Sequence, residues 1–198
     1  MLKAITLVSL ATATAAGAQT ASLNFDVIDP GPLSPGDSTM VFLSAGFDPA
    51  DYAIAGVLTD VLASAPRDLT GAWSDMALIA PMDGPGTAAG APSGMGGVSG
   101  IIAGQLNFPP AGIYADSTNP IAFWSATFTA PADQPGGYVV DLSTSTSRFD
   151  VYTDRRSSLS ESRLDGLVEG RGQIWVIPAP ASALVLLGGL GAALCRRR

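Results

Sequence analysis

The sequence predicts an all-β protein, an antiparallel β-sandwich with a targeting segment at each end. Three observations lead to this fold. Short segments alternate between apolar and polar residues. Clusters of Gly, Pro, Asn and Asp separate these segments, as in proteins made of many short strands. Only 14% of the residues are charged, and 23 Gly and 15 Pro among 198 residues supply many turns. This length allows one ordinary domain with additional end segments.

Residues 1–18 have the pattern of a secretory signal peptide. Lys3 supplies the positive charge, and Ala4–Ala16 form an uncharged, largely apolar run. Ala16 and Ala18 are the small residues that signal peptidase requires. We therefore expect export of the chain and cleavage after Ala18. The alternative is a buried N-terminal helix, which does not require this order of charge, apolar run and small residues.

Residues 19–177 are predicted to form one extracellular β-sandwich domain. The first strand is expected where Leu23, Phe25 and Val27 share one face. A second follows the turn at Ser34–Asp37. The alternating or β-branched segments expected as strands are, in chain order, Ser22–Val27, Ser38–Ser44, Val98–Phe108 with a bulge at Gly104, Ile121–Thr129, Gly137–Thr146 and Val168–Ile177.

Two further segments lack a clear strand pattern. Pro49–Ala65 fits a helix, with Asp48 as its N-terminal cap, or a strand that includes Ile54 and Leu58. Predicted strands on both sides favour the strand. Ala80–Gly97 is rich in Gly, Pro and Ala, and we predict a long loop there.

Residues 178–198 contain a Pro-x-Pro element, an apolar helix and a basic end, in that order. The first is Pro178-Ala179-Pro180, the helix is predicted over residues 181–195, and Arg196, Arg197 and Arg198 follow. A helix of this length spans about 22 Å. This is short of the roughly 30 Å hydrocarbon core, but it suffices for a transient stop-transfer segment. The arginines would stay on the cytoplasmic side. The alternative is a C-terminal hairpin of a soluble domain.

This order of segments resembles the PEP-CTERM sorting signal of bacteria, over residues 177–198. The usual motif is Pro-Glu-Pro, and Ala179 takes the middle position here. The resemblance implies an exosortase as partner, a membrane-embedded cysteine protease or transpeptidase. It further implies processing near Pro178–Pro180, transient residence in the inner membrane and transfer to the cell surface or extracellular matrix.

A second resemblance concerns the start of the sandwich. Leu33–Leu43 contains a Pro-Gly-Asp turn that leads into an alternating strand, and Phe47-Asp48-Pro49 follows. These residues are similar to the opening of cohesin-like surface modules. The resemblance implies a sandwich of the jelly-roll or cohesin-like kind and says nothing of catalysis.

Composition excludes several classes of chemistry. The chain has no histidine and one cysteine, which excludes Ser-His-Asp catalysis, His-ligated zinc and intrachain disulfides. Residues 19–177 carry six arginines against 17 acidic residues, a net charge of −11. This charge disfavours nucleic acid as a partner. We predict no cofactor, with a structural Ca²⁺ ion as the alternative.

The candidates for chemistry are carboxylates, tryptophans and serines. Loop aspartates could bind Ca²⁺, although aspartates also cap turns. The two glutamates could serve a glycosidase only if they faced each other. The tryptophans could stack on sugars or lie in the core, and Ser143–Ser147 could carry O-linked glycans. The aspartates are Asp26, Asp29, Asp48, Asp51, Asp150 and Asp154, the glutamates are Glu161 and Glu169, and the tryptophans are Trp73, Trp124 and Trp175.

The sequence therefore predicts an exported, surface-associated structural or matrix protein without catalytic activity. Its expected partners are signal peptidase, an exosortase-like membrane protease, the membrane through the C-terminal helix, and extracellular polysaccharide. The alternative is a carbohydrate- or Ca²⁺-binding module of the cell surface.

Overall fold

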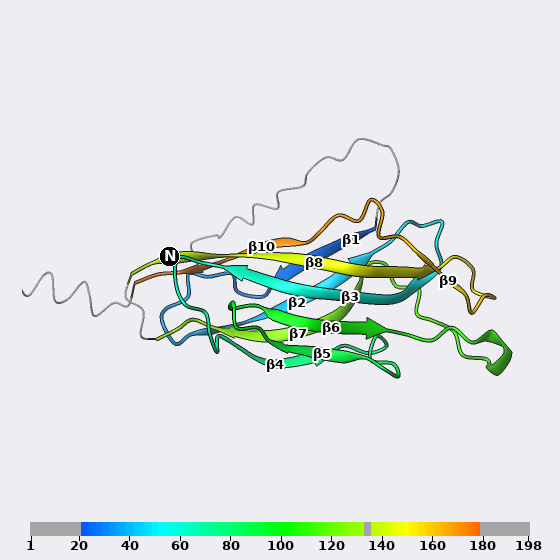
Figure 1. Ribbon diagram of the computed structural model, residues 1–198, viewed down its shortest axis with the longest axis horizontal. Helices are drawn as coiled ribbons and strands as arrows, with labels where there is room; N and C mark the ends of the chain where they lie inside the picture. The colour runs from blue at the N-terminus through cyan, green and yellow to red at the C-terminus, as the bar shows by residue number, and fades with distance from the viewer. Residues whose placement is uncertain (1–20, 133–135, 179–198) are drawn as a thin grey trace, which may run out of the picture.

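The computed structural model describes residues 21–132 and 136–178. These residues form ten β-strands and one short 3-10 helix, arranged as two antiparallel sheets packed face to face (Figure 1). The predicted all-β sandwich is confirmed. The predicted signal peptide, residues 1–18, and the predicted helix over residues 181–195 lie outside the described residues.

Each sheet is a run of hydrogen-bonded neighbours. In the described residues the first sheet has four strands, in the order β1 (Ser22–Val27), β2 (Ser38–Gly46), β7 (Ile121–Thr129) and β4 (Trp73–Leu78). The second has six: β10 (Arg171–Val176), β8 (Tyr138–Tyr152), β3 (Ala53–Ser64), β6 (Val98–Gly104) and β5 (Ala88–Pro92), with β9 (Ser160–Ser162) pairing with the far end of β8.

The core lies between the sheets and follows the alternation of the strands. Val41, Leu43 and Ala45 of β2 are fully buried, and the residues between them point outward or toward the edge. Val57 and Val61 of β3 meet them from the second sheet in the same hydrophobic cluster. Burying each large side chain of this kind stabilises the fold by about 1.5–3 kcal/mol, so the alternating pattern fixes which face of each strand turns inward.

Two indole groups connect the sheets along one side of the sandwich. Trp73 of β4 donates a hydrogen bond from Nε1 to the carbonyl oxygen of Gly96, at 2.6 Å. Trp124 of β7 donates from Nε1 to the carbonyl oxygen of Ala89 in β5, at 2.8 Å. Both side chains are buried, and Trp73 also packs edge-on against Phe128. The indoles therefore satisfy backbone acceptors in β5 and in the turn that joins β5 to β6 while they fill the core.

Strand β10 connects the sheets along the other side. It pairs antiparallel with β8 along one edge. Its other edge forms hydrogen bonds with residues near the N-terminal strand β1. The N–H of Leu33 donates to the carbonyl oxygen of Trp175, and the N–H of Ile177 donates to the carbonyl oxygen of Leu33, each at 2.8 Å. The N–H of Val168 donates to the carbonyl oxygen of Ala21. The last strand therefore holds the first strand region in place.

The strand predictions fared differently along the chain. Ser22–Val27 and Ile121–Thr129 are strands with the predicted bounds, and Pro49–Ala65 contains strand β3. The long loop predicted for Ala80–Gly97 is wrong, because β5 lies within it. Strands β4 and β9 were not predicted.

The strand predicted over Val98–Phe108 is also shorter than expected. It ends at Gly104, and Gly104 is not a bulge. The pairing with β3 instead shifts between Thr59 and Val61, because β6 has an extra residue opposite this point. Gly100 lies there with a positive φ, and its N–H donates to the Asp60 carboxylate.

We predict that Gly97→Ala destabilises the protein strongly, whereas Gly94→Ala in the same turn does not. A Cβ on Gly97 would lie 2.1 Å from the carbonyl oxygen of Val61, so the backbone would have to move. Nothing lies within 4 Å of a Cβ on Gly94. We expect a loss of about 1–3 kcal/mol for Gly97→Ala, measured by thermal or urea unfolding. Equal unfolding curves for the two variants would contradict the packing of this turn.

Candidate functional site

The sorting and cleavage residues predicted from the sequence lie almost entirely outside the described part of the chain. Ala16, Ala18, Ala179, Pro180 and the arginines 196–198 are not described. Pro178 is described and follows β10 by two residues. Gly137 packs against it, since a Cβ there would lie 3.2 Å from Cδ of Pro178. The predicted motif therefore begins directly at the folded domain.

Three of the six aspartates singled out for Ca²⁺ binding cap turns. Their carboxylate oxygens accept hydrogen bonds from backbone N–H groups two residues later, which is the usual role of Asp in such turns. These pairs are Asp29 with Gly31, Asp48 with Ala50, and Asp154 with Arg156. Asp150 instead pairs with Arg148. In the described part of the chain, no group of three or more His, Cys, Asp or Glu side chains could hold a metal ion.

Two further aspartates have the same turn geometry, and their ionisation reflects it. Hydrogen bonds from the side chain and backbone N–H of Thr118 lower the pKa of Asp116 below its usual value. Hydrogen bonds from Thr70 lower the pKa of Asp68 in the same way. A lowered pKa means that the folded turn favours the ionised form. Its contribution to stability is present above the unfolded pKa and declines as the pH falls below it.

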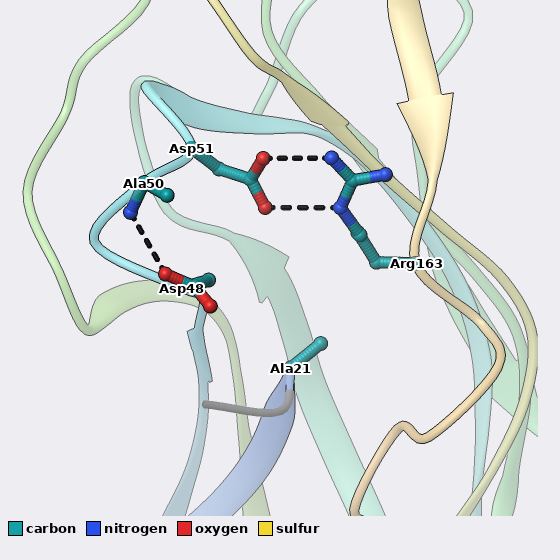
Figure 2. Close-up of a pocket in the computed structure, with 5 residues that line it drawn as sticks. All are labelled: Ala21, Asp48, Ala50, Asp51 and Arg163. Atoms are coloured by element: carbon teal, nitrogen blue, oxygen red, sulfur yellow. Dashed lines mark hydrogen bonds and ion pairs between the residues drawn. The ribbon is translucent and has the colours of Figure 1, made fainter. Parts of the chain in front are cut away.

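The best-defined ion pair joins the start of β3 to the segment after β9 (Figure 2). Arg163 donates from Nη2 to Oδ1 of Asp51 at 2.9 Å and from Nε to Oδ2 at 3.1 Å. The Asp51 side chain is only 6% exposed. Both groups line a small pocket of about 150 Å³ together with Asp48, Ala50 and Ala21.

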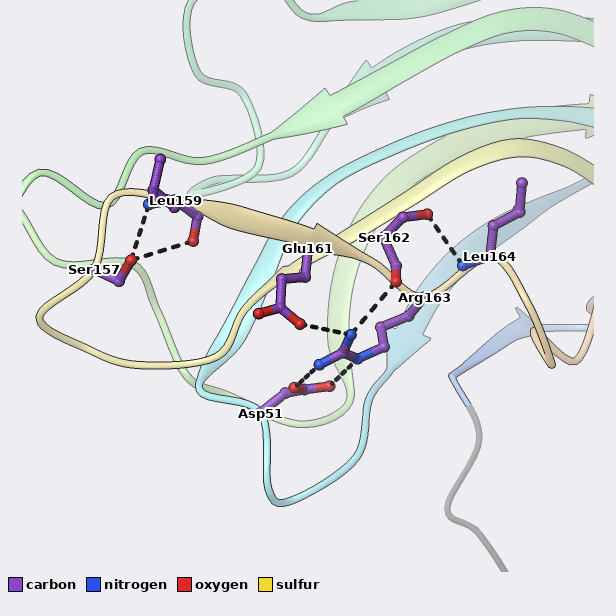
Figure 3. A network of polar contacts seen from close by, with 7 residues as sticks. All are labelled: Asp51, Ser157, Leu159, Glu161, Ser162, Arg163 and Leu164. Carbon is purple, nitrogen blue, oxygen red and sulfur yellow. Dashed lines mark hydrogen bonds and ion pairs between the residues drawn. The ribbon is translucent and has the colours of Figure 1, made fainter.

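Arg163 also organises the polar contacts around it (Figure 3). Its Nη1 donates to the carboxylate of Glu161 at 3.0 Å. The hydrogen bonds with Asp51 and, to a smaller extent, with Glu161 raise the pKa of the guanidinium above its ordinary value. The arginine is therefore a fixed cation that neutralises a buried carboxylate, and this geometry holds the chain after β9 against β3.

The structure does not bring the two glutamates together. Glu161 lies opposite Val151 of β8. Glu169 accepts hydrogen bonds from the N–H of Thr146 at 2.8 Å and from the hydroxyls of Thr146 and Thr144. Val151 and Thr146 are separated by roughly 16 Å of strand, whereas glycoside hydrolysis needs carboxyls within about 10 Å. The glutamates do not form a glycosidase pair.

The three tryptophans do not share one environment. Trp73 and Trp124 lie in the core, which is one of the two positions that the sequence allows for them. Trp175 is 57% exposed and points outward from β10. For Trp175, a core position is wrong, because it alternates with the buried Ile174 and Val176. No group of exposed, coplanar tryptophans arises from the described residues.

A groove on the outer face of the six-stranded sheet was not predicted from the sequence. On this face, Leu58 of β3 and Ile102 of β6 are register neighbours. The next pair toward the end of the sheet is Gly56 with Gly104, which leaves the floor without side chains. The loop at residues 85–87 closes the opposite side, and the hollow measures about 300 Å³.

The chemistry of this groove is mostly apolar. Ile102 is exposed and Leu58 is half-buried, and Pro85 adds a third apolar wall. Arg148 of β8, the register neighbour of Leu58, also lines the groove and is paired with Asp150. The groove offers a binding surface for an apolar group rather than a set of acids, bases and nucleophiles for a reaction.

Within residues 21–132 and 136–178, no helix has both the length and the apolar character needed to span a membrane.

Comparisons with known proteins give a fold and no family. No protein-family model matches this chain, and no characterised protein matches it in sequence. A cohesin module of a family 33 glycoside hydrolase from Clostridium perfringens is similar in structure, with a TM-score of 0.50 and 9% identity over 81% of this chain and 98% of that chain. The third cohesin of ScaC from Acetivibrio cellulolyticus, solved with the ScaB dockerin, has a TM-score of 0.41 and 13% identity over 80% of this chain and 99% of that chain. The first likeness shows a cohesin-like β-sandwich fold.

We predict that Arg163→Leu lowers the free energy of unfolding by about 1–3 kcal/mol, because it leaves the buried Asp51 carboxylate without its cation. The estimate is below that for a fully buried pair, since Arg163 is 35% exposed. Arg156→Leu, at an exposed position of the neighbouring loop, serves as the matched control and should change stability by less than about 0.5 kcal/mol. Urea unfolding measures both, and a neutral Arg163→Leu would show that the ion pair does not hold this segment.

Proposed function

We propose that this protein is exported and surface-associated, that an exosortase-like system sorts it, and that its β-sandwich is a non-catalytic module for structural or docking contacts. The order of segments in the sequence carries the proposal. A signal-peptide pattern precedes the sandwich, and a Pro-x-Pro element, an apolar run and three arginines follow it.

The bounds of the folded part support this organisation. Strand β1 begins at Ser22, four residues after the proposed cleavage at Ala18, and β10 ends at Val176, just before Pro178. The proposed targeting segments therefore lie directly before and after the strands of the described sheets in the sequence. Signal peptidase, an exosortase-like protease and the inner membrane are the partners that this proposal requires.

A non-catalytic role is supported by how the polar side chains are used. Asp29, Asp48 and Asp154 cap turns, Asp51 pairs with Arg163, and Glu169 binds backbone and hydroxyl groups of β8. A reactive carboxylate needs a substrate cleft and a second group facing it. The described residues place these carboxylates in structural contacts instead.

Docking of a protein partner is supported by the fold and by the groove. The cohesin-like sandwich supplies a six-stranded sheet with an outer face, and Leu58 and Ile102 expose apolar surface on it. Exposed apolar surface next to a hollow is typical of a binding site. We propose that the groove is the docking site of the sandwich.

A carbohydrate-binding module is the second candidate, and Trp175 is the observation that favours it. Its ring is exposed on the outer face of β10, where an indole can stack on a sugar. Binding to the polysaccharide of the producing cell, lost in Trp175→Ala and retained in Leu159→Ala, would support this function. Equal binding by both variants would exclude a role for Trp175.

We predict that removal of residues 178–198 changes where the protein accumulates. Without the apolar run and its arginines, nothing in the proposed signal would halt translocation, so the truncated protein should appear free in the periplasm or medium. Cell fractionation and intact-mass measurement test this. The full chain should show a mature N-terminus at Gln19 and a C-terminus processed near Pro178–Pro180.

Replacing the three arginines with glutamine is the matched variant, because it keeps the apolar run and removes the charge that orients it. It should give partial release. An unchanged cellular address and an unchanged mass in both variants would rule out the sorting proposal.

A further inference from the structure

The loop after β6 forms an apolar finger, defined here as residues 106–114. Its sequence, Leu-Asn-Phe-Pro-Pro-Ala-Gly-Ile-Tyr, contains no charged residue. Four large side chains are between 47% and 53% exposed, namely those of Leu106, Phe108, Ile113 and Tyr114. The finger lies at the end of the sandwich opposite the end of β10, where its short 3-10 turn is drawn in green at the far right of Figure 1. An exposed apolar group of this size marks an interaction surface.

The finger closes on itself as a small hairpin. The N–H of Phe108 donates to the carbonyl oxygen of Ile113 at 2.9 Å, and the N–H of Ile113 donates back to Phe108 at 3.3 Å. The 3-10 helix η1 (Pro109–Ala111) turns the tip, and Gly112 follows with a φ of 73°. The tip is therefore shaped by backbone hydrogen bonds, although its side chains face outward.

A buried asparagine fixes the finger to the neighbouring loop. The Asn107 side chain donates from Nδ2 to the carbonyl oxygens of Arg155 at 3.0 Å and Ser157 at 2.6 Å. Its Oδ1 accepts from the N–H of Ala115. The Tyr152 hydroxyl accepts from the N–H of Asn107. A finger held in this way loses little conformational freedom on binding, which favours association.

The groove described above lies beside the finger on the same chain. Gly104 forms part of its floor, and the finger begins two residues later. No finger residue is among those that line this groove. A cavity of about 150 Å³ holds benzene, so the groove, at about 300 Å³, has room for the Phe108 ring of another molecule.

We propose that the finger of one copy of this chain seats in the groove of a second copy, and that the exchange is reciprocal about a two-fold axis. The proposal names the partner of the docking groove and rests on that part of the proposed function; export and sorting do not depend on it. The finger is a convex surface and the groove a concave one, both expose apolar side chains, and each copy of the chain carries one finger and one groove.

The number of residues that an interface needs favours a reciprocal exchange, in which each copy contributes both its finger and its groove. A stable interface uses about 20–30 residues from each partner. The nine finger residues alone fall short of this number. With the buried Asn107, Val57 and Ala103 left out, the finger and the groove lining of one copy together offer 17 residues, close to its lower end. Because finger and groove are neighbours on one chain, a two-fold axis brings both pairs together at once, as in most homodimers.

Opposite charges lie at the margins of the two surfaces, while Arg148 of the groove lining is already paired with Asp150. Arg155 stacks over the Tyr114 ring at the base of the finger, 4.3 Å from its centre, and Arg156 beside it is exposed. Asp83 is exposed two residues before Pro85 of the groove wall. Opposite charges at the rim suit the apolar contact at the centre and set its orientation.

We predict a monomer–dimer equilibrium of the full chain, measured by sedimentation over a concentration series in a mild detergent. The finger variant, F108S with I113S, and the groove variant, I102E, should each raise the dimer Kd at least about tenfold. A mixture of the two variants should form a mixed dimer, because an intact finger from one meets an intact groove from the other. Met95→Ser is the control: it removes a highly exposed apolar side chain elsewhere and should leave the Kd unchanged.

Two results would overturn the proposal. One is a wild-type chain that stays monomeric at every concentration. The other is a dimer unaffected by the finger variant while that variant loses binding to phosphatidylglycerol-containing vesicles, which would make the finger a lipid contact. Circular dichroism confirms that each variant is folded. Fractionation of the same variants separates the proposals, since loss of the dimer with an unchanged cellular address leaves the sorting proposal intact.

Discussion

The closure of the sandwich along its two open sides is the constraint on which the rest of the structure depends. Two stacked sheets leave their edge backbone groups exposed unless something satisfies them. On one side, the indole of Trp124 donates to a carbonyl oxygen of the edge strand β5, and that of Trp73 donates to one in the turn between β5 and β6. On the other side, β10 exchanges hydrogen bonds with Leu33. Because both sides are tied, the inner faces stay covered, and binding surfaces are left to the outer faces and the loop ends.

The polar residues of the finger end have a structural task that explains their burial. Gln105 and Asn107 alternate with the exposed Leu106 and Phe108, so the polar side chains turn inward and the apolar ones outward. This reverses the usual preference. The inward amides find carbonyl partners, for example Gln105 Nε2 with the carbonyl oxygen of Ile54 at 2.8 Å. A fully satisfied polar network rigidifies its surroundings, and here it supports an apolar surface that faces solvent.

The sequence predicted the strands that alternate and failed where the structure depends on distant contacts. β1 and β2 follow from alternation, and β7 follows from its aromatic and β-branched residues between Asn119-Pro120 and Ala130-Pro131. Ala88–Pro92 has no such pattern and becomes a strand because β6 and the Trp124 indole supply its hydrogen bonds. β4 is interrupted near Asp75, whose φ of 52° breaks the alternation. The groove was unpredictable for the same reason, since Gly56 and Gly104 become neighbours only through strand register.

The position of Pro178 links the folded domain to the proposed sorting signal. Val176 is buried, Ile177 donates to Leu33, and Pro178 packs beside Gly137. The domain therefore holds the chain up to the first proline of the motif. Two residues of extended chain reach about 7 Å, so a protease acting near Pro178–Pro180 would work against the surface of the sandwich. If such processing occurs after folding, the end of β10 must open locally, and the strength of its pairing with Leu33 would then set how readily the motif becomes accessible.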